Sequence, residues 1–194
     1  MTGPTGPVTE PPDPRAARTR AKLRRALLDE CARRTLAEVN VAAVVRRAGV
    51  GRATFYLHYR DLEELSVDAC AGVVRDAVEA LHAWRGIPDP ASPPAALTSF
   101  CAALVPHAEV YRALLSPGGG GPLGRVLHEE LRARSLTERT LAGAPQPGLI
   151  ASAVAATFSG VLADWLHGYI EADSERFAAH VWLLLVTLHR AAVR

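Results

Sequence analysis

Apolar residues recur at helical spacing along nearly the whole chain, and no segment alternates between apolar and polar positions as a half-buried β-strand does. The pattern predicts an all-α protein in which two short helices stand among longer ones. The long helices are predicted over residues 15–36, 62–84, 95–105, 108–116, 123–141, 149–172 and 174–193.

Polar and helix-breaking residues mark where these helices begin and end. Asn40 and Asp61 can each accept a backbone N–H bond as the N-cap of a helix that starts one residue later. The proline-rich stretch 86–94 predicts a connector, the run 117–122 with its four glycines predicts a flexible interruption, and 142–148 predicts a further loop. A small N-terminal helical unit and a larger C-terminal bundle are therefore expected.

Two short helices over residues 41–60 carry the clearest chemical signal in the chain. They are joined by the tight turn Ala48-Gly49-Val50-Gly51, in which Gly49 supplies the permissive backbone that such a turn requires. This arrangement is typical of a helix-turn-helix, whose second helix enters the major groove of DNA. The side chains expected on the inner face of the two helices are Val44, Val45, Ala48, Val50, Phe55 and Tyr59.

The side chains left outward on the second helix suit DNA. Arg52 can donate two hydrogen bonds to the edge of a guanine, and Thr54 can contact a base edge or a thymine methyl. Ala53 lies between them and is a third candidate for base recognition. Tyr56 and His58 are candidates for phosphate contacts. The other candidates for contacts with the DNA backbone are Asn40, Arg46, Arg47, Arg60, Arg18, Arg20 and Lys22.

Charge supports the same interpretation, because the basic residues gather at the front of the chain. Residues 15–60 hold twelve Lys or Arg against three acids, a balance of +9, whereas from residue 65 onward ten basic residues face twelve acids, a balance of −2. A basic N-terminal region of this kind is expected to bind a polyanion. Two short helices around a glycine also occur in proteins that never bind DNA, and the charge favours DNA over that alternative.

The same segment resembles the DNA-binding region of TetR-family bacterial transcriptional regulators, in which an AGV turn precedes a T-[FLIV]-Y-x-[HY]-[FY] helix. Here AGV stands at 48–50 and TFYLHY at 54–59, and the resemblance covers residues 18–65 in motif detail. It implies a DNA-binding domain over 15–60 and a helical effector-binding and dimerisation domain over 61–194. It also implies a homodimeric repressor that a small apolar molecule releases from a palindromic operator.

Four positions depart from the family pattern. Thr35 and Val45 stand where a glycine and a small residue are usual, and Gly51 stands where a serine or threonine cap is common. Leu62 replaces a phosphate-binding lysine, a role that Arg60 can take over. The missing lysine keeps open an alternative, a helical protein-interaction module with weakened DNA binding.

The C-terminal half resembles the family in layout only, which implies that its last two long helices pair with those of a second copy. The broad apolar surfaces of these helices agree with burial on more than one side, although a monomeric core would also produce them. The candidate dimer-interface residues are Val154, Phe158, Val161, Tyr169, Val181, Leu185 and Leu188.

A ligand cavity inside the bundle is a further hypothesis, since aromatic and aliphatic residues with two histidines gather in this half. Each of these side chains could equally belong to an ordinary core. The candidate pocket residues are Phe100, Leu104, His107, Tyr111, Leu127, Leu131, Phe158, Leu162 and Trp165.

Composition excludes several other classes of protein. The chain of 194 residues is 49% hydrophobic and 22% charged, as in ordinary globular domains. We expect residues 1–14 to form a disordered tail and not a signal sequence, and no apolar stretch to reach the roughly 20 residues that cross a membrane. A cytoplasmic protein without a membrane partner is therefore expected.

Candidate catalytic and metal-binding patterns are missing from the sequence. Cys31, Cys70 and Cys101 are far apart and form no C-x-x-C pair, which favours buried thiols over a disulfide, a zinc site or a redox sensor. The seven histidines show no metal-ligand spacing, and neither a G-x-S-x-G motif nor a phosphate loop is present. We therefore expect no enzyme, no metal and no cofactor.

Overall fold

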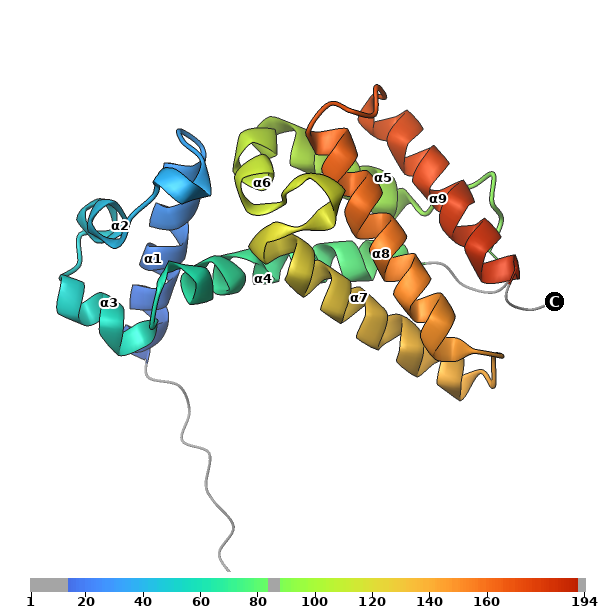
Figure 1. The fold of residues 1–194 in the computed structure, drawn as a ribbon, viewed down its shortest axis with the longest axis horizontal. Helices are drawn as coiled ribbons and strands as arrows, with labels where there is room; N and C mark the ends of the chain where they lie inside the picture. Colours follow the sequence, from blue (N-terminus) through green and yellow to red (C-terminus); the bar gives the residue numbers. More distant parts are fainter. Residues whose placement is uncertain (1–13, 84–87, 192–194) are drawn as a thin grey trace, which may run out of the picture.

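The computed structural model describes residues 14–83 and 88–191, and helices make up most of these ranges (Figure 1). No strand occurs within them, which confirms the all-α prediction. The predicted tail, apart from Pro14, lies outside the described residues. The helices are α1 Pro14–Cys31, α2 Val41–Ala48, α3 Arg52–His58, α4 Leu62–Leu81, α5 Ala95–Leu104, α6 Ala108–Leu114, α7 Gly121–Leu141, α8 Pro147–Leu166 and α9 Ser174–Ala191, with the 3-10 turns η1 Leu36–Glu38, η2 Val105–His107 and η3 Pro117–Gly119.

The helices form a head and a body that α4 connects (Figure 1). The head consists of α1, α2 and α3, and the body of α5 to α9. Helix α4 starts directly after the head, contacts α1 there, and then runs into the body, where α5 and α7 pack against it. Because one continuous helix contacts both parts, a displacement in the body can reach the head through α4.

The N-caps predicted from the sequence are present. The Asn40 side chain accepts a hydrogen bond from the backbone N of Ala43 at 3.0 Å, and the Asp61 side chain accepts one from the backbone N of Glu64 at 2.8 Å. Between α2 and α3, Gly49 adopts φ 65° and ψ 36°, a left-handed conformation that other residues rarely tolerate. These local signals therefore define the start of α2, the turn and the start of α4.

Several helices, among them α4 and α6, end before the residue that the sequence pattern predicts, and the difference is largest for α1 and α8. Helix α1 ends at Cys31 and not at residue 36, and Thr35 then starts η1, where its backbone N and hydroxyl both donate to Glu38 Oε2 at 2.9 Å. Helix α8 ends at Leu166 and not at residue 172, because the chain turns at Gly168. A glycine just past the end of a helix is a common stop signal, so this second end was visible in the sequence.

The glycine-rich run 117–122 forms a hydrogen-bonded turn that packs on the body, so the expectation of a flexible interruption is wrong. The backbone N of Ser116 donates to the carbonyl of Gly120 at 3.0 Å, and the backbone N of Gly119 donates to that of Ser116 at 3.1 Å. A Cβ on Gly119 would lie 3.0 Å from the carbonyl carbon of Ser159 in α8. The small residues let this turn lie directly on the backbone of α8.

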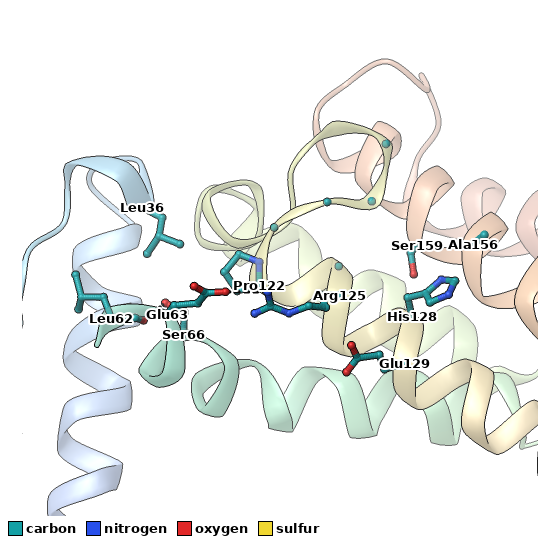
Figure 2. Close-up of a pocket in the computed structure, with 15 residues that line it drawn as sticks. Leu36, Leu62, Glu63, Ser66, Pro122, Arg125, His128, Glu129, Ala156 and Ser159 are labelled. Carbon is teal, nitrogen blue, oxygen red and sulfur yellow. Dashed lines mark hydrogen bonds and ion pairs between the residues drawn. The ribbon is translucent and has the colours of Figure 1, made fainter. Parts of the chain in front are cut away.

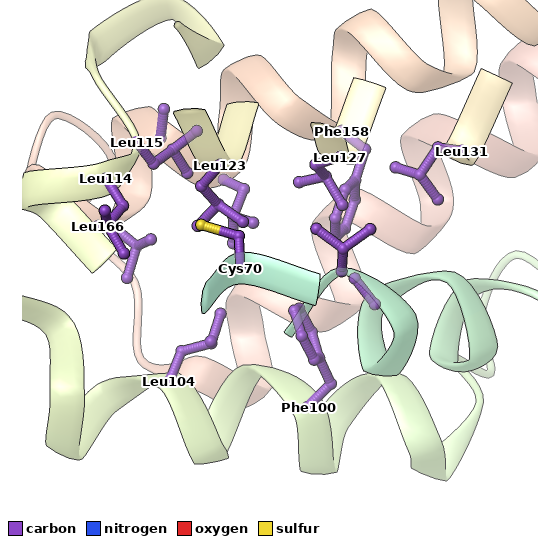
Figure 3. Packing of buried hydrophobic residues seen from close by; sticks show 14 of the residues in the cluster. Cys70, Phe100, Leu104, Leu114, Leu115, Leu123, Leu127, Leu131, Phe158 and Leu166 are labelled. Atoms are coloured by element: carbon purple, nitrogen blue, oxygen red, sulfur yellow. The ribbon is translucent and has the colours of Figure 1, made fainter. Parts of the chain in front are cut away.

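One hydrophobic core joins head and body, and Figure 3 shows its central part, where side chains from α4 to α8 converge. The three cysteines are buried in it, as predicted. Burial raises the pKa of Cys31 to about 11 and those of Cys70 and Cys101 to about 12. These thiols are therefore protonated and poor nucleophiles at neutral pH.

Helix α8 is long and apolar enough to cross a membrane by length and composition, so the expectation that no stretch reaches about 20 residues is wrong. It has 20 residues, and its most apolar window of 18 residues has a mean hydropathy of 1.6. Within the protein it packs against α7, η3 and α9, as a core helix does. Within that window 39% of the residues are buried, and most of the other residues of α8 are half-buried.

Candidate nucleic-acid interface

The inner face of the helix-turn-helix is packed as the sequence predicts. Val44 and Phe55 are completely buried and Tyr59 is 2% exposed, while Val45, Ala48 and Val50 are half-buried against the same core. The Phe55 and Tyr59 rings lie 6.0 Å apart between centroids. This packing fixes the angle between α2 and α3, so that α3 presents one defined face to the outside.

The exposed face of α3 consists of two pairs of residues that are each one turn apart. Arg52 and Tyr56 form one pair, and Ala53 and Leu57 form the other; all four side chains are exposed. Thr54, which the sequence placed among the outward residues, is half-buried at the edge of this face, as is His58. The surface that can enter a groove is therefore centred on Arg52, Ala53, Tyr56 and Leu57.

Leu57 is the residue of this face that the sequence analysis missed. It is 81% exposed, although an apolar side chain between two aromatic positions is expected to point inward. Its spacing of four residues from Ala53 was the available signal, because residues one turn apart share a face. An exposed leucine there can contact a thymine methyl.

A polar cluster holds the end of α3 to α4 and α1. The Tyr59 hydroxyl donates to Asp68 Oδ2 in α4 at 2.5 Å and accepts a bond from Arg20 Nε in α1 at 3.4 Å. Arg24 lies 3.3 Å from the same carboxylate oxygen. Burial and the nearby Asp68 raise the pKa of Tyr59, which keeps the phenol protonated as a donor. The orientation of α3 is thus tied to the position of α4.

We expect Tyr59→Phe to lower the free energy of unfolding by about 1.5–3 kcal/mol, since it removes a hydrogen bond to a charged group from a buried position. The measurement is urea denaturation. Tyr56→Phe is the matched control, because the Tyr56 side chain is 51% exposed and makes no hydrogen bond within the described ranges. An equal loss of stability in both variants would contradict the role of the cluster.

A second ion pair braces α2 against α1. The carboxylate of Glu30, which is 2% exposed, binds Arg47 Nε and lies 3.0 Å from Arg34 Nη2. The hydrogen bond from Arg47 and the charges of both arginines hold the pKa of Glu30 below its usual value despite the burial. Arg47, expected to contact DNA phosphates, is therefore committed to a structural contact.

The other residues predicted to contact the DNA backbone lie on the surface of the head. Arg18, Lys22 and Arg46 are exposed and form no ion pair with any described residue. Arg60 is 86% exposed in its side chain and bonds Glu64 at 3.1 Å. Asn40 is exposed, and its cap uses only Oδ1, so that its amide N–H groups can still donate. Leu62 is half-buried and packs against the core.

The body contains a cavity of about 480 Å³ between α1, α4, α5 and α6, which we call the lateral cavity. Four predicted pocket residues line it, namely Phe100, Leu104, His107 and Tyr111. Leu127 and Leu162 line only a narrow space of about 10 Å³ beneath it. Leu131, Phe158 and Trp165 line neither space and are core residues, so the prediction is wrong for them.

The sequence did not predict that residues of α1 and α4 also line the lateral cavity. These residues include Leu28 and Asp29 from α1, and Cys70, Val73 and Asp76 from α4. Residues that lie more than forty positions apart come together only in the fold, so no local pattern could have identified them. As a result, an occupant of this cavity would touch the head as well as the body.

The predicted dimer residues divide into buried and accessible groups. Phe158, Val181 and Leu185 are at most 6% exposed inside the protomer, so the expectation that they face a second copy is wrong. Val154, Val161 and Leu188 are half-buried and Tyr169 is 70% exposed. The exposed leucines of α9, which the prediction left out, are Leu183 at 49% and Leu184 at 42%.

Comparison of the sequence with protein-family models finds no matching family. A sequence search of curated proteins finds no match either. The fold, in contrast, matches solved structures over almost the whole chain. NalD, the secondary repressor of the MexAB-OprM multidrug efflux pump in Pseudomonas aeruginosa, superposes with a TM-score of 0.59 at 17% identity, over 93% of this chain and 98% of NalD.

Two further structures give a similar result. A TetR transcriptional regulator from Streptococcus agalactiae matches with a TM-score of 0.58 at 18% identity, over 89% of this chain and 95% of the regulator. RolR, solved in complex with its ligand resorcinol, matches with a TM-score of 0.53 at 20% identity, over 93% and 95% of the two chains. The chain thus has the fold of TetR-type transcriptional regulators, with an N-terminal helix-turn-helix and a C-terminal helical domain. NalD is named as a repressor and the Streptococcus agalactiae protein as a transcriptional regulator.

Proposed function

We propose that this protein is a homodimeric transcriptional regulator whose helix α3 binds in the major groove of DNA. The observation that carries the proposal is the exposed face of α3, held rigid by buried Phe55 and Tyr59 in the most basic part of the chain. A rigid outward helix with Arg52 beside small and apolar side chains is suited to reading base edges. The fold shared with TetR-type regulators supports the same function.

A second copy of the chain is the partner that suits the open surface of α8 and α9. Val154 and Val161 of α8, together with Leu183 and Leu184 of α9, leave apolar surface uncovered on two adjacent helices. Burial of such surface against its own copy would produce a two-fold axis and two reading heads. Recognition of a palindromic operator follows from that symmetry.

The lateral cavity is the proposed site for a small, mostly apolar effector. Its volume of about 480 Å³ is within the range of small-molecule sites, and its inner wall includes Phe100, Leu104 and Leu114. Since α1 of the head forms one wall, an occupant that separates α1 from α6 would reorient the head. Effector and operator would then weaken each other's binding reciprocally, by about 1–3 kcal/mol, as expected of a cytoplasmic repressor released by its ligand.

Selection of bound fragments from a random duplex DNA library tests this function directly. We expect a two-fold symmetric consensus with half-sites about 34–36 Å apart, one turn of DNA, or a multiple of that distance. An asymmetric consensus would contradict the dimer while keeping the DNA-binding function. If no sequence is enriched at low salt, the protein-interaction module remains as the better explanation.

Arg52→Ala is expected to relax the preference at one base position and to cost about 1–3 kcal/mol on the selected site. Lys22→Ala is the comparison, because an exposed lysine on α1 is suited to a phosphate contact and not to a base edge. It should weaken binding on all sequences alike and reduce the salt slope by about 1. Equal losses on every sequence for Arg52→Ala would contradict its role in base recognition.

A further inference from the structure

A groove of about 740 Å³ lies where the head meets the body, and we call it the junction groove (Figure 2). On the head side it is lined by Leu36 of η1 and by the first turns of α4, and on the body side by the glycine-rich turn, α7 and α8. It is separate from the lateral cavity and shares no lining residue with it. An occupant would lie directly between the reading head and the rest of the protein.

The floor of the junction groove holds a buried hydroxyl without a partner. Ser159 of α8 is 3% exposed, lines the groove, and its Oγ makes no hydrogen bond with any described residue. Figure 2 shows this Oγ directed toward the side of α7 that carries His128. His128 lines the groove as well and likewise forms no hydrogen bond within the described part of the chain. Buried polar atoms normally have a hydrogen-bond partner, so this hydroxyl is free to bond a group that enters the groove.

The start of α7 adds a positive end to the same groove. The helix has 21 residues, its N-cap is Gly120, and no side chain caps its first turn. Residues 118–121, which lead into it, line the groove. The free N–H groups and the helix dipole together favour a negatively charged group at such a position.

One ion pair crosses the groove from α7 to the first turn of α4. Arg125 of α7 lies 2.8 Å from the carboxylate of Glu63 in α4, and the two side chains are 50% and 64% exposed. Exposed pairs of this kind contribute little stability, so another carboxylate can take the place of Glu63. Arg125 is therefore available to a ligand that enters the groove.

We propose that the junction groove binds a small amphipathic monocarboxylate. Its carboxylate would accept hydrogen bonds from the Ser159 hydroxyl and from His128, and the side chain of Arg125 would turn from Glu63 toward it. Its apolar part would extend along the groove toward Pro122, on the side of the head.

The charges in the groove favour one negative charge over two. Glu63 and Glu129 line the groove together with a single guanidinium, that of Arg125, so a dianion would meet uncompensated carboxylates. Replacement of Glu63 would also release the ionic contact between α4 and α7. The groove is thus a second regulatory position at the junction, distinct from the proposed effector site.

The experiment is calorimetric titration of the full-length protein with benzoate, with benzamide as the neutral isostere and inorganic phosphate as the dianionic probe. We expect saturable binding of benzoate, with benzamide and phosphate at least about tenfold weaker. Arg125→Gln should weaken benzoate binding by about tenfold or more, whereas Glu63→Gln should strengthen it, because it removes the competing carboxylate.

Ser159→Ala is the decisive variant, since the hydroxyl has no partner to lose in the free protein. We expect an unchanged or slightly higher Tm together with benzoate binding that is about tenfold weaker. Ser99→Ala, on the exposed side of α5, is the control and should bind benzoate as the wild type does. Absence of saturable benzoate binding, equal binding by Ser159→Ala and Ser99→Ala, or tighter binding of phosphate would each overturn the proposal. None of these readouts depends on DNA.

Discussion

Gly124→Ala is expected to lower the free energy of unfolding by about 3 kcal/mol, the upper part of the range for overpacking a close contact. A Cβ at this position would lie 1.9 Å from the carbonyl oxygen of Gly119 and 3.0 Å from Leu115 Cδ1. The nearest atom belongs to the backbone, so no rotation of a side chain can relieve the overlap. Either α7 or the glycine-rich turn must move.

Neither of these elements can move freely. Gly119 itself lies against the backbone of α8, where a Cβ on Gly119 would be 3.0 Å from the carbonyl carbon of Ser159. Helix α7 is held between α4 and α8. The overlap at Gly124 is therefore transmitted to the core of the body.

The control for this prediction is the same substitution at a position with open space. Gly72 lies inside α4, and a Cβ there would meet no atom within 4 Å. Gly72→Ala should stabilise the protein by about 0.8–1.0 kcal/mol, because alanine has the higher helix propensity. Urea denaturation of both variants measures the difference, and shifts of the same sign and size would show that the close contact at Gly124 is not decisive.

Phe55→Ala is expected to destabilise the protein by about 3–5 kcal/mol and to abolish DNA binding. Phe55 is completely buried and belongs to the core that holds α3 against α2 and α1. Its removal leaves a cavity under α3 and deprives Tyr56 and Tyr59 of a ring contact. The measurements are denaturant unfolding and the affinity for the selected operator.

Leu57→Ala on the same helix separates packing from recognition. Its side chain is 81% exposed, so we expect a change in stability within about 0.5 kcal/mol. If Leu57 contacts a thymine methyl, the variant loses affinity only for sites that carry thymine at that position. A large loss of stability in Leu57→Ala would show that this residue is not on the free face of α3.

The two proposed ligand positions contact the head at different places. The lateral cavity reaches α1, which contributes Leu28 and Asp29 to its wall, whereas the junction groove reaches η1 and the first turns of α4. Both positions are connected to α3 through the cluster of Tyr59, Asp68 and Arg20. A ligand that shifts α1 or α4 relative to the other would disturb this cluster and with it the orientation of α3.

The sequence by itself determined the helix-turn-helix, because every signal for it is local. Asn40 and Asp61 cap helices that begin one residue later, Gly49 permits the left-handed turn, and the spacing of Phe55 and Tyr59 identifies the buried face. Caps, turns and helical periodicity each depend on residues within one or two turns of one another. The exposed position of Leu57 was available from the same periodicity.

The tertiary structure decided which partners the remaining side chains have. Periodicity indicates that a face of α8 or α9 is apolar, but it does not distinguish Phe158 in the protomer core from Leu184 on the surface. Nor does it show that Arg47 is held by Glu30, or that the hydroxyl of Ser159 is buried without a partner. These contacts join distant segments, and the packing of whole helices against each other determines them.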